Sequence, residues 1–249
     1  MAKSMPPKGP RRSKNTGKAA NILRLSLFWA IVIVGGLALI AIFNPPENLK
    51  EVPISDVINR ANKGEIRNAA LQRRNRLDAE YRKRASMIIA ELAKPFIKHA
   101  SVILSYHKIN TEADPKYIDT NKSKVLHPVI ISDDKMAAAD YKDNRNVPVN
   151  ISDMGMRDGI SIENPKNIDL ILMPLVAFDV NMNRIGYGKA YYDRFLNDVW
   201  GCNTPGSNDK MPPRIGLAFK CQLTENIPVD THDVKLSAVI TEEGIIRRG

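Results

Sequence analysis

The fold of this chain is decided by one stretch, Asn183-Arg-Ile-Gly-Tyr-Gly-Lys-Ala-Tyr-Tyr-Asp-Arg-Phe-Leu196. It follows an apolar run from Asp169 to Phe178, which predicts a buried strand. The order along the chain is therefore a strand, a glycine loop and a helix. Glycine lets main-chain N–H groups approach an anion, so a glycine loop that opens a helix predicts a phosphate-binding site.

Charged side chains on both sides of the glycines favour a nucleotide as the ligand. Arg184 and Lys189 supply positive charge, and Asp193 lies one helical turn beyond Lys189, where a carboxylate can hold the Mg²⁺ that accompanies a nucleotide. Together these residues predict ATP. The structural alternative is an ordinary glycine turn, with Tyr191 and Tyr192 as packing residues.

The stretch also resembles the signature of the 5-formyltetrahydrofolate cyclo-ligase family, whose members are also called methenyltetrahydrofolate synthetases. The similarity spans about Lys63 to Glu242. The segments that carry it are Asp169–Asp179, Asn183–Asp193, Gly216–Gln222, Ile227–Val229, His232–Val234 and Ala238–Glu242. The resemblance implies an open α/β sheet with helices on both faces and ligands beyond the carboxyl ends of its strands.

The reaction implied by the resemblance is ATP-dependent closure of 5-formyltetrahydrofolate to 5,10-methenyltetrahydrofolate, with release of ADP and phosphate. The formyl oxygen is a poor leaving group, so ATP first phosphorylates it, N10 then attacks the activated carbon, and phosphate leaves. Catalysis of this kind depends on positioning and charge neutralisation. The resemblance implies Arg184, Lys189 and Tyr192 as catalytic residues, with ATP as co-substrate and Mg²⁺ as cofactor.

The resemblance also implies which residues contact each ligand. Those implied for ATP are Lys63, Arg67, Arg184, Ile185, Gly186, Tyr187, Gly188, Lys189, Ala190, Tyr191 and Tyr192. Those implied for 5-formyltetrahydrofolate are His107, Glu112, Tyr187, Gly188, Lys189, Ala190 and Tyr191. Asp193 and Asp233 are implied as Mg²⁺ ligands. From the residues alone, the basic side chains near position 67 are instead a solvated helix face, and His107 and Glu112 are solvated loop residues.

The net charge of +10 comes partly from the N-terminus. Residues 1–46 hold seven of the 37 basic residues and no acidic residue. Residues 1–24 contain no aromatic residue and are rich in Pro, Gly, Ser and Lys, which predicts a disordered basic tail. A nucleic-acid-binding face usually interleaves basic with aromatic residues, so no nucleic acid is expected as a partner.

Residues 25–43 form an apolar run in which Ser26 is the only polar residue. Its length predicts an uncleaved transmembrane helix, and therefore a single-pass membrane protein with the membrane as a partner. The basic residues before it predict a cytoplasmic N-terminus, whereas the predicted substrates favour a cytoplasmic catalytic domain. Residues 1–66 resemble the anchor of membrane-bound AAA zinc proteases. The rest of the chain is then a linker at 44–62 and a cyclo-ligase-like domain at 63–249.

Alternating strand and helix patterns predict a layered α/β domain. Strands are expected near residues 101–106, 125–131, 169–174, 215–219 and 236–241, and helices at 66–94 and 189–200. Residues 133–165 are expected to be irregular. The chain departs from the family pattern at His107, where the family often has methionine, and at His127, where it tends to have an apolar residue. Cys202 and Cys221 lack a metal-binding spacing, so zinc is not expected.

Two function classes stay open at this point. One is an ATP-dependent cyclo-ligase, and the other is a membrane-tethered module that binds nucleotide or folate without catalysis. The predicted topology favours the second class, because it puts residues 47–249 on the outer side of the membrane. A fusion of reading frames, with the enzyme beginning near Glu51, is a third explanation. The presence of glycines, cations, tyrosines and a carboxylate in one loop favours the enzyme.

Overall fold

The computed structural model describes residues 54–141, 149–150, 160–201 and 211–248. They belong to one compact unit that spans Pro53–Gly249. The predicted basic tail (1–24) and the predicted transmembrane span (25–43) lie outside the described residues. Within the described ranges, no helix is both long and apolar enough to cross a membrane.

A nine-stranded sheet forms the centre of the described unit. Its strands follow the order β11-β10-β9-β6-β1-β2-β3-β5, and β4 pairs with β2 beside this path. The bounds are β1 Val102–Leu104, β2 Lys124–Ile130, β3 Met136–Tyr141, β4 Val149–Asn150, β5 Ile160–Ile162, β6 Leu170–Met173, β9 Arg214–Leu217, β10 Ala238–Thr241 and β11 Gly244–Arg247. The five central strands, from β10 to β2, pair in parallel. The outer strands β11, β3 and β5 join antiparallel.

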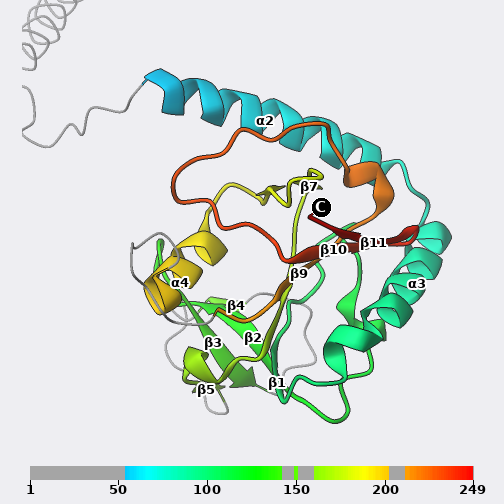
Figure 1. The fold of residues 1–249 in the computed structure, drawn as a ribbon, viewed down its shortest axis with the longest axis vertical. Coiled ribbons are helices and arrows are strands. Elements are labelled where there is room, and N and C mark those ends of the chain that lie inside the picture. Colours follow the sequence, from blue (N-terminus) through cyan, green and yellow to red (C-terminus); the bar gives the residue numbers. More distant parts are fainter. Residues whose placement is uncertain (1–53, 142–148, 151–159, 202–210, 249) are drawn as a thin grey trace, which may run out of the picture. The chain divides into compact units, whose positions relative to one another are not determined.

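The central strands are buried on both faces, as β6 illustrates. Its residues Leu170 and Leu172 pack in one apolar cluster with α3 (Ala79–Ile97), whereas Ile171 and Met173 pack in another with α4 (Tyr191–Trp200). Successive side chains of a strand point to opposite faces, so α3 and α4 cover opposite faces of the sheet. Figure 1 shows the two helices on either side of the strands. The predicted α/β sheet with helices on both faces is confirmed.

The helix predicted at 66–94 is in fact two helices. The first, α2, spans Ile54–Asn75, so part of the predicted linker is helical, and α3 follows after a short break. Asp78 ends the break because its carboxylate accepts the backbone N–H of Tyr81 at 2.7 Å and caps α3. The amphipathic spacing continues across the break, and this continuity made the two helices resemble one in the sequence.

A small hairpin of β7 (Ala177–Phe178) and β8 (Arg184–Ile185) follows the carboxyl end of β6 and stands apart from the main sheet. Helix α2 contacts β7, and Figure 1 shows it running along this side of the described unit. Ala70 of α2 packs with Ile185 in a small apolar cluster. One face of α2 therefore lies beside the loop that leads into α4.

Residues 133–165 are not irregular throughout, and that prediction is wrong. They contain β3 and β5, which pair with each other, and β3 also pairs with β2. A tight turn joins β2 to β3, in which Ile131 donates its N–H to the carbonyl of Lys135 at 2.9 Å. The sequence of β3 is rich in alanine, which is depleted in strands, so pairing with β2 determines this strand rather than local preference. The other predicted strands, and α4, lie close to their expected bounds.

Candidate active site

The loop at residues 186–190, called the glycine loop below, follows a hairpin that a buried carboxylate holds in shape. Asp179 is fully buried at the turn between β7 and β8. It accepts backbone N–H groups from Asn181 and Asn183 at 2.9 Å and from Ile227 at 3.1 Å. These bonds fix the turn, so β8 leads the chain into the glycine loop in one orientation. The role of Asp179 is structural.

Two residues of the glycine loop adopt left-handed backbone conformations. Gly188 has φ = 98° and Ala190 has φ = 52°. The left-handed conformation costs a non-glycine residue roughly 1–2 kcal/mol, and strain of this kind is concentrated at functional sites. Ala190 is also the N-cap of α4 and makes no side-chain hydrogen bond to the first turn. The N-terminal end of α4 therefore has no side-chain cap and can offer its N–H groups and dipole to an anion.

Arg67 of α2 lies against the glycine loop. Its Nε donates to the carbonyl of Gly186 at 2.8 Å. Its Nη2 lies 3.5 Å from the position that a Cβ on Gly188 would occupy. Burial lowers the pKa of Arg67. The structure thus brings a cation predicted to contact ATP together with both glycines of the loop.

Lys63, one helical turn before Arg67, points elsewhere. Its ammonium group pairs with Asp230 at 2.8 Å and with Asp233 at 2.5 Å, and its side chain is 12% exposed. Burial lowers the pKa of Lys63, but the hydrogen bonds and charges of the two aspartates outweigh this effect and the pKa is raised. Lys63 is therefore held by carboxylates, one of which, Asp233, is a predicted Mg²⁺ ligand.

The other predicted Mg²⁺ ligand, Asp193, is also paired with a cation. Its Oδ1 accepts from Nη2 of Arg184 at 2.9 Å and from the backbone N–H of Val234 at 3.0 Å. Arg184 donates a second hydrogen bond to the carbonyl of Val234, and its side chain is only 6% exposed. The structure therefore places Asp193 next to the segment that contains Asp233. It directs Arg184 at Asp193.

The donor chemistry of these two aspartates fits Mg²⁺ that arrives with a nucleotide. Mg²⁺ prefers oxygen ligands and is usually held by one or two carboxylates, with phosphate oxygens and water completing its shell. The residues that the structure describes contain no group of three or more His, Cys, Asp or Glu side chains that can hold a metal ion by themselves. If such an ion binds here, Asp193 and Asp233 would supply protein oxygens, and the nucleotide and water would have to supply the remaining ligands.

Glu112 is a buried carboxylate near the glycine loop. It is 3% exposed, and its Oε2 accepts the backbone N–H of Ile109 at 2.8 Å. Burial raises the pKa of Glu112, against the opposing effects of this N–H, the hydroxyl of Tyr187 and the charges of Arg74 and Lys108. The other oxygen, Oε1, is also buried and makes no hydrogen bond of regular geometry within the described residues, although the hydroxyl of Tyr187 lies close enough to influence the carboxyl. Such an oxygen is an acceptor suited to a ligand N–H group.

Arg74, which is not predicted as a site residue, links Glu112 and the glycine loop. It is 1% exposed, and its Nη2 donates to the hydroxyl of Tyr187 at 2.9 Å. Burial and the charge of Glu112 raise the pKa of Tyr187 to about 12. The sequence does carry a signal for Arg74: it follows Arg67 by seven residues, a spacing that puts both on one face of α2.

The remaining loop residues have mixed environments. Lys189 is exposed, and its carbonyl accepts from Nη2 of Arg194 at 2.7 Å. The guanidinium of Arg194 lies over the ring of Tyr191, 5.3 Å from its centroid. Tyr192 is half-buried against the cluster around α4, whereas Ile185 is buried beneath the loop. Lys189 is thus the exposed cation of the loop.

His107, predicted to contact folate, stacks on His127. The ring centroids are 4.1 Å apart and the planes are inclined by 10°. Burial, and then the neighbouring His107, lower the pKa of His127 to about 4. His127 is therefore neutral at neutral pH. His107 and His127, the two positions where the chain departs from the family pattern, are in direct contact with each other.

Comparisons with known proteins identify related sequences and related folds. The model of the 5-formyltetrahydrofolate cyclo-ligase family matches residues 59–242. A probable 5-formyltetrahydrofolate cyclo-ligase of Schizosaccharomyces pombe is 34% identical over 88 residues, which are 34% of this chain and 43% of that protein. The cyclo-ligase of Mycoplasma pneumoniae is 28% identical over 128 residues, 51% of this chain and 62% of that protein. These aligned segments thus span about half the length of the relatives.

Two solved structures share the fold. The 5,10-methenyltetrahydrofolate synthetase of Mycoplasma pneumoniae has a TM-score of 0.57 at 24% identity, covering 72% of this chain and 98% of that chain. The synthetase of Aquifex aeolicus has the same TM-score and identity, covering 74% of this chain and 92% of that chain. These likenesses establish the mixed α/β fold.

The same findings correct one prediction from the sequence. Residues 25–43 predict a single-pass membrane protein, and this localisation is wrong, because the matched family and the relatives named above are cyclo-ligases. The membrane is therefore not retained as a partner. The comparisons also do not show the resemblance of residues 1–66 to AAA zinc proteases. The family model covers most of the chain, and the chain belongs to the 5-formyltetrahydrofolate cyclo-ligase family.

Proposed function

We propose that this protein catalyses the ATP- and Mg²⁺-dependent cyclisation of 5-formyltetrahydrofolate to 5,10-methenyltetrahydrofolate, with release of ADP and phosphate. One observation carries the proposal: the glycine loop contacts the cation of Arg67 on one side and lies near the buried carboxylate of Glu112 on the other. Gly186 and Gly188 face Arg67, whereas Tyr187 between them bonds Arg74 beside Glu112. This arrangement suits a loop that binds two ligands: a nucleotide, whose phosphates need cations and N–H donors, and a folate, whose ring N–H groups need an acceptor.

The nucleotide belongs on the Arg67 side in this proposal. Arg67, Lys189, the glycine amides and the uncapped N-terminal end of α4 supply donors for phosphate oxygens. Lys63 reaches the phosphates only by leaving Asp230 and Asp233, so its predicted contact requires a side-chain movement. The other proposed ATP contacts are the backbone and side chains of Arg184, Ile185, Gly186, Tyr187, Gly188, Ala190, Tyr191 and Tyr192.

The folate belongs on the Glu112 side. Oε1 of Glu112 is a buried acceptor and suits an N–H donor of the pterin ring. The stacked pair of His107 and His127 offers an aromatic surface near the carboxyl end of β1. The proposed folate contacts are His107, Glu112, Tyr187, Gly188, Lys189, Ala190 and Tyr191.

The proposed chemistry follows from the poor leaving ability of the formyl oxygen. The γ-phosphoryl group passes from ATP to this oxygen, which leaves ADP and activates the formyl carbon. N10 then attacks the carbon and releases its proton, the carbon–oxygen bond breaks, and phosphate departs with the former formyl oxygen. In this proposal Lys189 neutralises charge on the phosphoryl group, and Arg184 acts by holding Asp193 in position. Mg²⁺ on Asp193 and Asp233 supplies further charge neutralisation when it is bound.

Coupled turnover by the full chain tests the proposal. We expect ATP hydrolysis only when 5-formyltetrahydrofolate is present, with one methenyltetrahydrofolate, followed by its absorbance, formed per ADP. ATP hydrolysis that is independent of folate contradicts the cyclo-ligase. Binding of both ligands without turnover indicates the non-catalytic binding module instead.

A further inference from the structure

Arg74 is the largest of the fully buried side chains in the described part of the protein. It lies in the last turn of α2 and donates to three segments that are distant in the sequence. Nε donates to the hydroxyl of Thr111 at 3.1 Å, Nη1 to the carbonyl of Leu175 at 3.4 Å, and Nη2 to the hydroxyl of Tyr187 at 2.9 Å. One guanidinium thus joins α2, the loop after β1, the end of β6 and the glycine loop.

These three acceptors are all neutral, which leaves the charge of Arg74 to be balanced elsewhere. A buried charge is unfavourable unless an opposite charge compensates it. Glu112 is the buried acid that interacts with this charge, because Arg74 lowers the pKa of Glu112. The hydroxyl of Tyr187 interacts with both Arg74 and Glu112. Arg74 donates to Thr111, the residue before Glu112, and to Tyr187, so its guanidinium is held on the side of the site where this buried carboxylate lies.

We propose that Arg74 is a positioning residue for folate binding: its bonds to Thr111 and Tyr187 hold the loop after β1 and the glycine loop on either side of Glu112, and its charge favours the ionised form of that buried carboxylate. An ionised Glu112 accepts N–H groups of the substrate, whereas a neutral one presents a proton to them. This inference rests on the proposed function, because it assigns Glu112 to the folate.

Among the charged groups that face Glu112, Arg74 has the largest effect on the charge of this carboxyl. Arg74 comes from α2, Tyr187 from the glycine loop, and Lys108 and Tyr106 from its own side of the site. Lys108 has a side chain that is 36% exposed and pairs with Asp114 at 3.3 Å, so solvent and an acid screen its charge. Tyr106 is buried and neutral, since burial raises its pKa well above the ordinary value. Arg74 is therefore the buried cation at this carboxylate.

The direction in which folate affinity changes when Arg74 loses its charge follows from the pKa of the Glu112 carboxyl. Burial already raises its pKa, and loss of the Arg74 charge raises it further. A larger fraction of Glu112 is then protonated at any given pH. Folate binding by a variant without this charge should weaken relative to the native protein, and the difference should grow as the pH falls.

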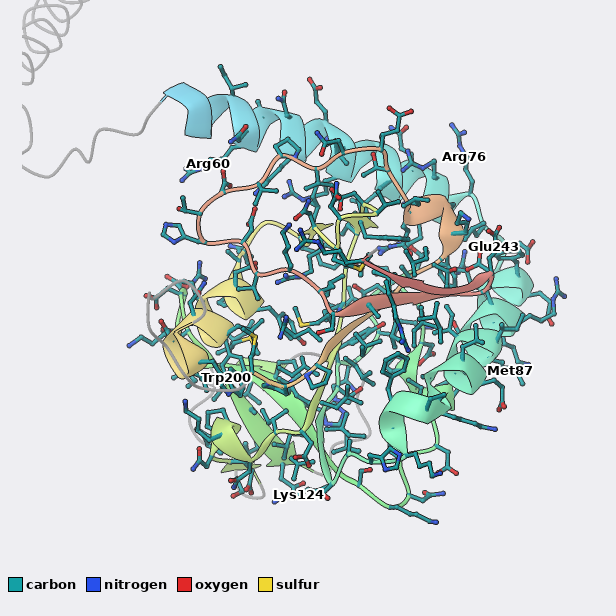
Figure 2. The ribbon with its side chains drawn as sticks, viewed as in Figure 1. Arg60, Arg76, Met87, Lys124, Trp200 and Glu243 are labelled. Carbon is teal, nitrogen blue, oxygen red and sulfur yellow. The ribbon has the colours of Figure 1, made fainter. Side chains whose placement is uncertain are left out.

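The test compares Arg74→Gln with the matched control Arg76→Gln in the full chain. Arg76 lies just after α2, is exposed at the surface (Figure 2), and loses the same charge when replaced. The readouts are the dissociation constant of 5-formyltetrahydrofolate by calorimetry across the neutral pH range, and separate KM values for both substrates. We expect Arg74→Gln to weaken folate binding about tenfold, as for one charge-assisted hydrogen bond, and to raise the KM for ATP by a clearly smaller factor, because the glycine loop serves both ligands but Glu112 serves folate alone.

Two further variants separate positioning from general stability. Tyr187→Phe removes the link and keeps the ring, so it should weaken folate binding in the same direction even if Arg74→Gln does not fold. In a Glu112→Gln background, Arg74→Gln should no longer shift the pH dependence, because the amide does not titrate. Equal loss of ATP and folate affinity, or a pH profile that matches Arg76→Gln, overturns the inference. A native protein that binds folate but does not cyclise it contradicts the proposed function alone, since the binding constants still test Arg74.

Discussion

Replacing Asp193 by asparagine tests how the carboxylate beside the glycine loop contributes to stability. Oδ1 of Asp193 accepts two hydrogen bonds, from Arg184 at 2.9 Å and from the N–H of Val234 at 3.0 Å. Hydrogen bonds to a charged group stabilise by about 1.5–3 kcal/mol and neutral ones by about 0.5–1.5 kcal/mol. Asparagine keeps the acceptor and loses the charge, so each bond weakens by about 1 kcal/mol. The free energy of unfolding should fall by about 2 kcal/mol.

Urea denaturation of the variant and of a matched control measures this loss. Asp198→Asn changes an exposed acid on the same helix, and we expect its stability to stay within about 0.5 kcal/mol of the native value. An acid that interacted with the helix dipole alone would contribute about 0.3–1 kcal/mol. A loss for Asp193→Asn no larger than that of the control therefore refutes the contribution assigned to the pair with Arg184.

The same variant tests the proposed metal site through a separate readout. If Asp193 holds Mg²⁺, the concentration of Mg²⁺ for half-maximal formation of methenyltetrahydrofolate should rise by about tenfold or more, while the affinity for 5-formyltetrahydrofolate stays near the native value. An unchanged Mg²⁺ requirement together with an unchanged rate shows that Asp193 is not a ligand. The metal site then has to be assigned around Asp233 or abandoned.

Three other predictions follow from the described contacts. Lys189→Ala should lower kcat/KM by an amount equivalent to about 2–4 kcal/mol of transition-state stabilisation, with no change in the urea midpoint because Lys189 is exposed; a native rate would remove it from the proposed catalytic set. Asp230→Asn should lower stability by no more than about 1 kcal/mol near neutral pH, since Asp230 is partly exposed. Because Lys63 outweighs burial and lowers the pKa of Asp230, that contribution should disappear as the pH falls through this lowered pKa, which acid titration of both proteins can check. His127, with a pKa of about 4 in the folded protein against an ordinary value near 6.5, should make the native protein up to about 3 kcal/mol less stable as the pH falls between these values; His127→Phe should abolish that slope, and an unchanged slope contradicts the shift.

Local patterns in the sequence are enough to predict several elements of this protein. The apolar run at 169–178 contains β6, which is buried on both faces, and the residues after Ala190 form α4 close to the expected bounds. Gly186 and Gly188 lie in the loop between β8 and α4, and Arg67 of α2 contacts that loop, whereas their contacts with phosphate stay predictions. These features can be predicted from sequence because the periodicity of apolar residues and the conformational freedom of glycine are set by residues close together in the chain.

Tertiary structure alone decided the partners of the charged side chains. Lys63 pairs with Asp233 across 170 positions of sequence, and Arg74 bonds Tyr187 across 113 positions. A basic residue on an amphipathic helix looks the same in sequence whether it faces solvent, a carboxylate or a tyrosine. The alanine-rich strand β3 likewise exists because β2 pairs with it. The physical reason is common to all three: long side chains and edge strands take their final state from whichever distant segment the fold brings within hydrogen-bonding distance.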